Sequence, residues 1–334
     1  LCAFYRKVPK TDHKKVKTLL LQLSQDSNVI VRKTLTVALP SLINPSICTI
    51  LNITNTSTTF DTSKISRASS SSSSVKDIST RLIKNLSSDK SASVLIEVPQ
   101  SLALFAEVGY NDAINNSISK SDEKSDTKSK SDSPKSSSTQ TNSLSALNEG
   151  LDSLYEFIVE CCKKLYDSNI WQAQSVLVSY LDQIFLLKYR STTNSSNDKQ
   201  SNSSAAHRRR SASYSLISLP KVAIRFLRSI SKSCASKKGG DANNGSEDAD
   251  AVIRSSIARQ LSFIFRARCF DKEKGEFETF AKSLINDIDP NVRRAAAESI
   301  GGIFTNRRGG DEAVPSFIEE SLSSLLNDSD LDVK

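Results

Sequence analysis

Acidic and basic side chains recur in this sequence at one fixed spacing, which raises the question of acid–base chemistry. The segment "NDIDPNVRRAAAESIGGIF" (residues 286–304) has Asp287 followed by Val292 and Arg293, five and six residues later. A catalytic role would need a second carboxylate or a histidine beside such a group. The 334-residue chain has two histidines, and it has no G-x-S-x-G motif and no phosphate-binding glycine loop. We therefore expect no enzymatic activity.

Metal ligands are equally sparse. The histidines are His13 and His207, too few for a His-rich zinc site. None of the cysteines forms a C-x-x-C pair, and we interpret them as buried thiols. They are Cys2, Cys48, Cys161, Cys162, Cys234 and Cys269. The sequence predicts no metal and no cofactor.

The pattern around Asp287 has further copies, in which an aspartate is followed at +5 by an apolar residue and at +6 by a basic one. The matching pairs are Asp26 and Arg32, Asp248 and Arg254, Asp287 and Arg293, and Asp328 and Lys334. Two weaker copies begin at Asp89, with Leu95 in the basic position, and at Asp167, with Ala173 there. Six copies of one pattern indicate an internal repeat.

The distances between these aspartates agree on one period. Asp248 and Asp287 are 39 residues apart, and Asp287 and Asp328 are 41 apart. The longer intervals, of 63, 78 and 81 residues, fall to about 41–43 when four Ser- and Asn-rich segments are set aside. A period of about 40–47 residues with two helices per unit is typical of HEAT repeats.

The four segments that interrupt the period are poor in apolar residues. They lie at about residues 52–74, 110–143, 191–213 and 233–247. Such compositions bury too little surface to offset the entropy of ordering, so we expect disordered insertions.

Between the insertions, apolar residues recur with helical spacing, and no hairpin pattern is present. We expect an all-α fold, a HEAT-repeat α-solenoid (an armadillo-like superhelix). It would form one array over residues 1–334, a fragment of a longer chain. The expected units are at about 12–44, 75–108, 147–188, 214–267, 275–306 and 313–334, the last being incomplete.

The repeated pattern has a structural explanation. Each unit would be a helix, a tight turn with Asp or Asn caps, and a second helix, with Pro290 near the start of one such helix. The basic residue at +6 could reach the aspartate of a neighbouring unit. We predict that the following residues staple repeat to repeat: Asp26, Arg32, Asp89, Asp167, Asp248, Arg254, Asp287, Arg293 and Asp328.

Two segments resemble a known family. The segment "FAKSLINDIDPNVRRAAAESIG" (residues 280–301) is similar to a middle unit of the scaffold (A) subunits of protein phosphatase 2A. The segment "VLIEVPQSLALFAEVG" (residues 94–109) resembles their second unit. The repeats resemble those of regulatory subunit 1 of protein phosphatase 4 almost as closely. The four insertions depart from the compact pattern of the family.

This resemblance implies a non-catalytic scaffold that binds phosphatase regulatory and catalytic subunits along its intra-repeat turns. Candidate partner-binding residues are Ser27, Asn28, Trp171, Asp289 and Asn291. We expect no membrane partner, no obligate homo-oligomer, and a cytoplasmic location with the nucleus as the other compartment. The net charge of +8 keeps an alternative open, a HEAT-repeat adaptor in nuclear transport or a nucleic-acid-associated assembly. Arginines before Ser211 make this serine a candidate phosphosite.

Overall fold

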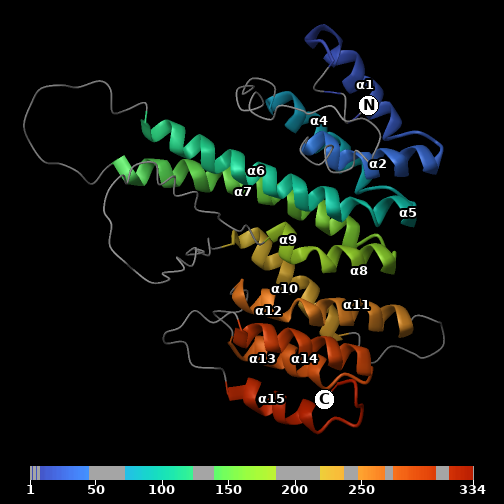
Figure 1. Cartoon of the computed structure of the whole chain (residues 1–334), viewed down its shortest axis with the longest axis vertical. Helices are drawn as coiled ribbons and strands as arrows, with labels where there is room; N and C mark the ends of the chain where they lie inside the picture. The colour runs from blue at the N-terminus through green and yellow to red at the C-terminus, as the bar shows by residue number, and fades with distance from the viewer. Residues whose placement is uncertain are drawn as a thin grey trace, which may run out of the picture.

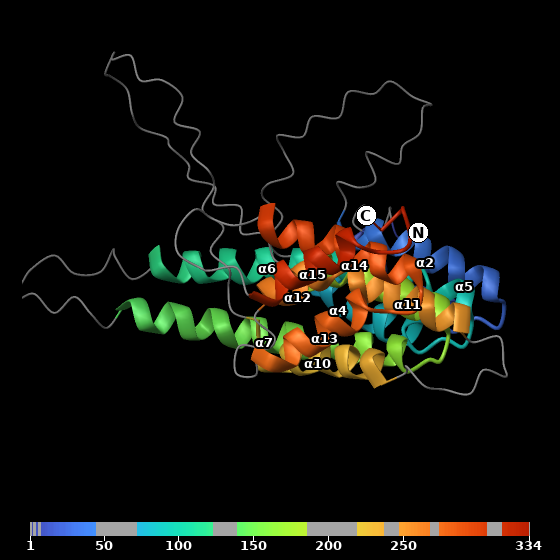
Figure 2. The same ribbon diagram turned by 90° about the horizontal axis from the view of Figure 1, so that it is seen from below.

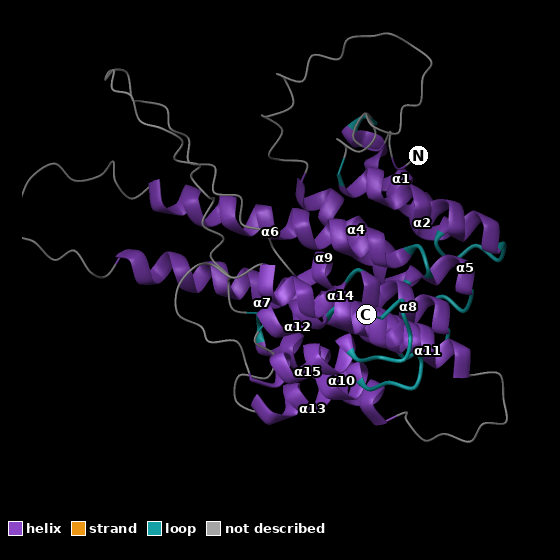
Figure 3. Ribbon diagram, turned by 60° about the horizontal axis from the view of Figure 1, so that its bottom comes forward, coloured by secondary structure: helices purple, strands orange, loops and turns teal. Residues whose placement is uncertain are grey.

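The fold is described from a computed structural model, which covers residues 2, 5, 8–44, 72–122, 139–185, 219–236, 247–267, 274–305 and 316–333. Within these ranges the regular elements are helices, and no strand is present (Figure 3). The all-α prediction is confirmed for this part of the chain.

The helices follow the expected order of segments. A short 3-10 helix, η2 (Lys10–Asp12), comes first. The α-helices are α1 (His13–Leu23), α2 (Val29–Ile43), α4 (Ser72–Leu86), α5 (Ala92–Leu95), α6 (Val98–Asp122), α7 (Thr139–Tyr166), α8 (Trp171–Ser179), α9 (Leu181–Phe185), α10 (Lys221–Ser236), α11 (Glu247–Arg259), α12 (Leu261–Arg266), α13 (Lys274–Ile285), α14 (Pro290–Thr305) and α15 (Ser316–Leu326).

These helices form pairs that we call units 1 to 6. The pairs are α1 with α2, α4 with α5–α6, α7 with α8–α9, α10 with α11–α12, α13 with α14, and α15 with the turn that follows it. The units follow one another from α1 at one end of the molecule to α15 at the other (Figure 1). Contacts between units therefore join segments that are far apart in the sequence.

The stack has two layers. In the first layer α1 contacts α4, α7 contacts α10, and α13 contacts both α10 and α15. In the second layer α2 contacts α6, α8 contacts α5 and α11, and α14 contacts α11 and α12. Seen from below, α7, α10 and α13 lie on one side and α2, α6 and α14 on the other (Figure 2). The apolar core lies between the layers along the stack.

Small residues let neighbouring helices come close. In α14, Val292, Ala295, Ala296 and Ile300 are buried, the face that the helical spacing predicts. In α6, a Cβ atom on Gly109 would lie 2.9 Å from Cδ1 of Leu154 in α7. The missing side chain at this glycine therefore brings the two helices together.

The helices extend into segments that we expected to be disordered. Helix α6 continues to Asp122 and α7 begins at Thr139, although the expected insertion was 110–143. Helix α4 begins at Ser72, and α10 continues to Ser236. Once a helix is nucleated on packed residues, each added residue gains a hydrogen bond, so composition alone places such ends poorly. The remaining parts of the four insertions lie outside the described residues.

One stretch, Ala92–Ala113, is long and apolar enough to cross a membrane by length and composition. Its most apolar window is 56% buried inside the protein, where α6 packs against α2, α4, α7 and α9. The contacts of α6 with these helices account for the apolar residues that it buries.

The adjacent thiols of Cys161 and Cys162 lie in the core of unit 3 and are fully buried. Burial raises the pKa of Cys161 to about 11 and raises that of Cys162 well above its usual value. Both side chains therefore remain neutral thiols at ordinary pH, as expected for core residues.

Candidate partner-binding edge

Arginine–aspartate pairs join three of the junctions between units. Arg32 in α2 donates from Nε to Oδ2 of Asp89 at 2.6 Å and from Nη2 to Oδ1 at 3.1 Å. The same guanidinium donates from Nη1 to the backbone oxygens of Asp26 and Ser27. One side chain thus joins the turn of its own unit to the aspartate of the next.

The same arrangement occurs twice more. Arg254 donates to the two carboxylate oxygens of Asp287 at 2.8 and 3.0 Å. Arg293 donates to those of Asp328 at 2.7 and 2.8 Å. Arg293 also donates to the backbone oxygens of Asp287 and Ile288. Bidentate pairs of this kind fix orientation as well as distance.

In the turns of units 1 and 5, two polar side chains bond to backbone N–H groups. The first aspartate accepts from the backbone N–H two residues on, as in Asp26 to Asn28 at 2.8 Å and Asp287 to Asp289 at 3.0 Å. The helix cap is the second residue: Asn28 accepts from the N–H of Ile30, and Asp289 from that of Asn291. The expected Asp or Asn caps are therefore present in these two turns. The first aspartate closes the turn, and Asp287 also pairs with Arg254 of the preceding unit.

Replacing the cap residue Asn28 with alanine should lower the free energy of unfolding by about 1 kcal/mol, because the N–H of Ile30 loses its acceptor. Urea unfolding followed by circular dichroism measures this effect. Asn28→Ser keeps an acceptor and should stay within about 0.5 kcal/mol of the native protein. Equal losses in the two variants would show that the cap contributes nothing.

The pair at the first junction makes stability depend on pH. Burial alone would raise the pKa of Asp89, but hydrogen bonds from Arg32 and from the N–H of Ser91 outweigh it and hold this pKa below its usual value. A carboxyl with a lowered folded pKa stabilises the protein above its unfolded pKa, near 3.9. This contribution disappears as the pH falls below about 4 and through the folded pKa.

Asp89→Asn should therefore flatten the fall in stability below about pH 4, and it should also lower stability at pH 7. Urea unfolding midpoints at a series of pH values measure both effects. Asp332→Asn, at an exposed site, is the control. An unchanged acid slope in Asp89→Asn would contradict the role of this carboxylate.

The basic residue of the pattern is absent at both junctions of unit 3, the one with unit 2 and the one with unit 4. Leu95, fully buried, occupies the basic position of unit 2, and Ala173 occupies that of unit 3. In unit 3, Gln174 donates from Nε2 to the backbone oxygen of Tyr166 at 2.5 Å. Gln174 thus bonds to the last residue of α7, whereas Arg32 bonds to two residues of the turn itself. In the turn of this unit, Asn169 has a left-handed backbone conformation, with φ of 57°.

The remaining predicted site residues do not take part in these pairs. Asp167 is exposed, and among the described side chains it forms no ion pair. Asp248 is the second residue of α11 rather than a turn residue, and its side chain lies outside the description. Ser211 and Lys334 are also outside the described residues.

Exposed ion pairs join helices of the first layer. Lys17 of α1 pairs with Asp77 of α4, and Lys84 of α4 with Glu160 of α7. Further along, α10 is joined to α13 and α13 to α15. These pairs are Lys232–Glu276 and Lys282–Glu320. Such half-exposed pairs contribute little to stability, typically below about 1 kcal/mol each.

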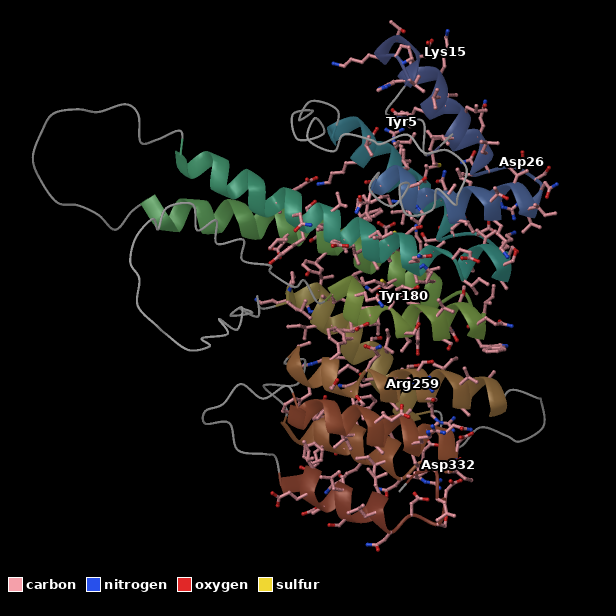
Figure 4. The ribbon with its side chains drawn as sticks, in the orientation of Figure 1. Tyr5, Lys15, Asp26, Tyr180, Arg259 and Asp332 are labelled. Carbon is pink, nitrogen blue, oxygen red and sulfur yellow. The ribbon has the colours of Figure 1, made fainter. Side chains whose placement is uncertain are left out.

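The turns within the units lie along one edge of the stack, which we call the turn edge: residues 24–28, 87–91, 167–170, 286–289 and 327–330, with the helix residues that directly follow. Asp26 and Asp332, in the first and last turns, lie on the same side of the molecule (Figure 4). A shallow polar hollow of about 260 Å³ separates the first two turns. It is lined by Ser24, Gln25, Asp26, Arg32, Asn85, Ser88, Asp89 and Lys90.

Large apolar side chains are exposed in three of these turn regions. Ile30 and Trp171, four residues after the aspartates of units 1 and 3, are 69% and 41% exposed. Ile288, in the turn of unit 5, is 92% exposed. Trp171 was expected within its turn and is the first residue of α8, directly after that turn. Val252, four residues after Asp248, is 41% exposed but is the sixth residue of α11.

The other predicted contact residues have mixed positions. Ser27 and Asn291 are exposed, whereas the side chains of Asn28 and Asp289 each use an oxygen in a cap. Ile30, Val252 and Ile288 were missed in the sequence, although the position four residues after the repeated aspartate could have identified the first two. Among the described residues, no group of three His, Cys, Asp or Glu side chains could hold a metal ion.

Comparisons with known proteins leave the family open. No protein-family model and no curated protein matches this chain. Among solved structures, a crystal structure of an engineered protein is similar, with 15% identity, a TM-score of 0.26, and coverage of 99% of this chain and 80% of that one. A likeness at this TM-score carries no weight for fold or function.

Proposed function

We propose that this chain is a HEAT-repeat α-solenoid and a non-catalytic scaffold of a serine/threonine protein phosphatase of the 2A type. Two layers of paired helices and arginine–aspartate pairs between successive units support the repeat assignment. The observation that carries the scaffold role is the exposure of Ile30, Trp171 and Ile288 on the turn edge. Regulatory and catalytic phosphatase subunits are the proposed partners there.

Trp171 and Ile288 are the proposed anchors. Exposed large apolar residues on a rigid frame fill pockets of a partner at little entropic cost, and tryptophan is favoured at such hot spots. The frame is fixed by the pairs Arg254–Asp287 and Arg293–Asp328, which hold the turn of unit 5 from both sides. A partner would therefore meet Ile288 in a position that these two pairs already set.

Capture of phosphatase subunits by the immobilised chain tests this function. Native protein should retain phosphatase catalytic activity from a cell extract, identified by mass spectrometry. Trp171→Ala and Ile288→Ser should each weaken binding roughly 30-fold, the effect of losing a hot spot of about 2 kcal/mol. Because Ile288 is almost fully exposed, its replacement should change stability by less than about 0.5 kcal/mol.

Val37→Ser provides the matched control, because Val37 is 54% exposed in the middle of α2, away from the turns. Its binding should equal that of the native protein. Recovery of no phosphatase subunit would rule out the proposed function. Binding to RNA that weakens steeply with salt would favour the adaptor alternative instead.

A further inference from the structure

The junctions between units differ in how firmly their side chains fix them. At the junctions of units 1–2, 4–5 and 5–6, a bidentate arginine–aspartate pair sets both the distance and the orientation of the neighbouring units. At the junction of units 3 and 4, which we call the joint, Ala173 occupies the position of the arginine. No such pair can form there, whatever residue faces it.

Hydroxyl and amide groups of the described residues make two polar contacts across the joint. Oγ of Ser175 in α8 lies 2.9 Å from Oγ of Ser256 in α11. Gln260 donates from Nε2 to the backbone oxygen of Ser179 at 3.4 Å, a long hydrogen bond. The Phe185 ring meets Phe226 at 6.3 Å between centroids. This apolar contact is non-directional, so it resists separation more than it resists sliding.

The helices of the second layer are interrupted on both sides of the joint. Helix α8 ends before Tyr180 and α11 ends at Arg259, and each is followed at once by a short helix (Figure 4). Beyond the breaks, α9 contacts α6 of unit 2 and α12 contacts α14 of unit 5. The second layer therefore spans the joint mainly through α8 and α11.

The junction of units 2 and 3 also lacks an arginine, but it is held in another way. The long helices α6 and α7 pack along each other, with Gly109 against Leu154. Lys84 and Glu160 pair across it at 3.0 Å. Units 1–3 are thus tied together on one side of the joint, and units 4–6 on the other.

We infer that the stack changes its curvature at the joint, by sliding of α8 on α11, while units 1–3 and units 4–6 move as two blocks. Interfaces of packed helices permit small shear motions of this kind. Trp171 lies on one block and Ile288 on the other, so the motion changes the separation of these two residues on the turn edge. The inference does not depend on which partner binds there.

A disulfide across the joint tests the inference. The variant Ser175→Cys/Ser256→Cys replaces hydroxyls that already lie in contact, a geometry suited to a disulfide. A control variant, Ser262→Cys/Gly302→Cys, clips the junction of units 4 and 5, where the two Cβ atoms would lie 3.4 Å apart. Single-molecule energy transfer between dyes on enzymatic tags at the two ends of the chain reports the distribution of end-to-end distances.

Oxidation of the Ser175→Cys/Ser256→Cys variant should make the distribution of end-to-end distances narrower than that of the native protein, and a reductant should restore the native width. After oxidation, the control variant should still show a distribution as wide as that of the native protein. The inference is overturned if the two disulfides narrow the distribution equally, or if neither changes it. It is also overturned if the joint cysteines fail to bond under conditions that oxidise the control pair, because Ser175 and Ser256 would then not be in contact.

Discussion

Replacing Asp287 with alanine is expected to lower the free energy of unfolding by about 3–5 kcal/mol, the cost of breaking a buried ion pair. The side chains of Arg254 and Asp287 are 11% and 1% exposed, so the arginine would remain buried without its carboxylate. The N–H of Asp289 would also lose its acceptor within the turn. Urea unfolding followed by circular dichroism measures the loss.

Two further variants distinguish the cost of leaving one charge unpaired from the cost of removing the whole pair. In Arg254→Met/Asp287→Leu both charges are removed, and this double variant should be far more stable than Asp287→Ala, because apolar replacements of buried pairs are often neutral. Asp332→Ala, at an exposed site, should change stability by less than about 0.5 kcal/mol. A loss below about 1 kcal/mol in Asp287→Ala would contradict the role of this pair in holding units 4 and 5 together.

The second large effect is expected at Phe185, whose replacement by alanine should cost about 3–5 kcal/mol. This ring is fully buried, stacks on Tyr155 at 6.0 Å with an interplanar angle of 9°, and meets Phe226 of unit 4. Truncation removes the apolar contact that units 3 and 4 share and leaves a cavity. Thermal and urea unfolding should both report the loss.

Phe185→Leu fills most of the same volume, so its loss of stability should be less than half of the loss in Phe185→Ala. Trp171→Phe, on the exposed turn edge, is a second aromatic control and should leave the unfolding midpoint unchanged. If Phe185→Ala unfolded at the native midpoint, the packing described for the aromatic cluster of units 3 and 4 would be wrong.

Periodicity was sufficient to predict that the described parts of the chain are helical, but it did not place the ends of α6 and α7. The spacing of Asp26, Asp287 and Asp328 also located three turns, because a turn between two helices needs short polar side chains that bond to nearby backbone groups. The spacing further suggested that an arginine would reach a neighbouring unit. It could not give the direction, from each arginine to the aspartate of the following unit, which depends on how the units stack.

Unit 3 shows why the rest was not predictable. Its turn has the same first three residues, Asp167, Ser168 and Asn169, as the turn at Asp26. Asn169 nevertheless adopts a left-handed conformation, whereas Asn28 is extended and caps its helix. The residues downstream of the two turns differ: Gln174 bonds to the last residue of α7, whereas Arg32 bonds to the turn itself. The same three residues therefore form different turns when the residues around them differ.

The reaction of the buried thiols of unit 3 with an alkylating reagent can be used to measure local unfolding of this unit. An alkylating reagent attacks thiolate, and burial keeps Cys161 and Cys162 both protonated and out of reach. Their rate of modification at neutral pH is therefore the rate of the reagent with an exposed thiol, reduced by the fraction of time for which unit 3 is open. A mass shift on the peptide that carries both cysteines, compared with the same peptide in urea, would measure that fraction for the central unit.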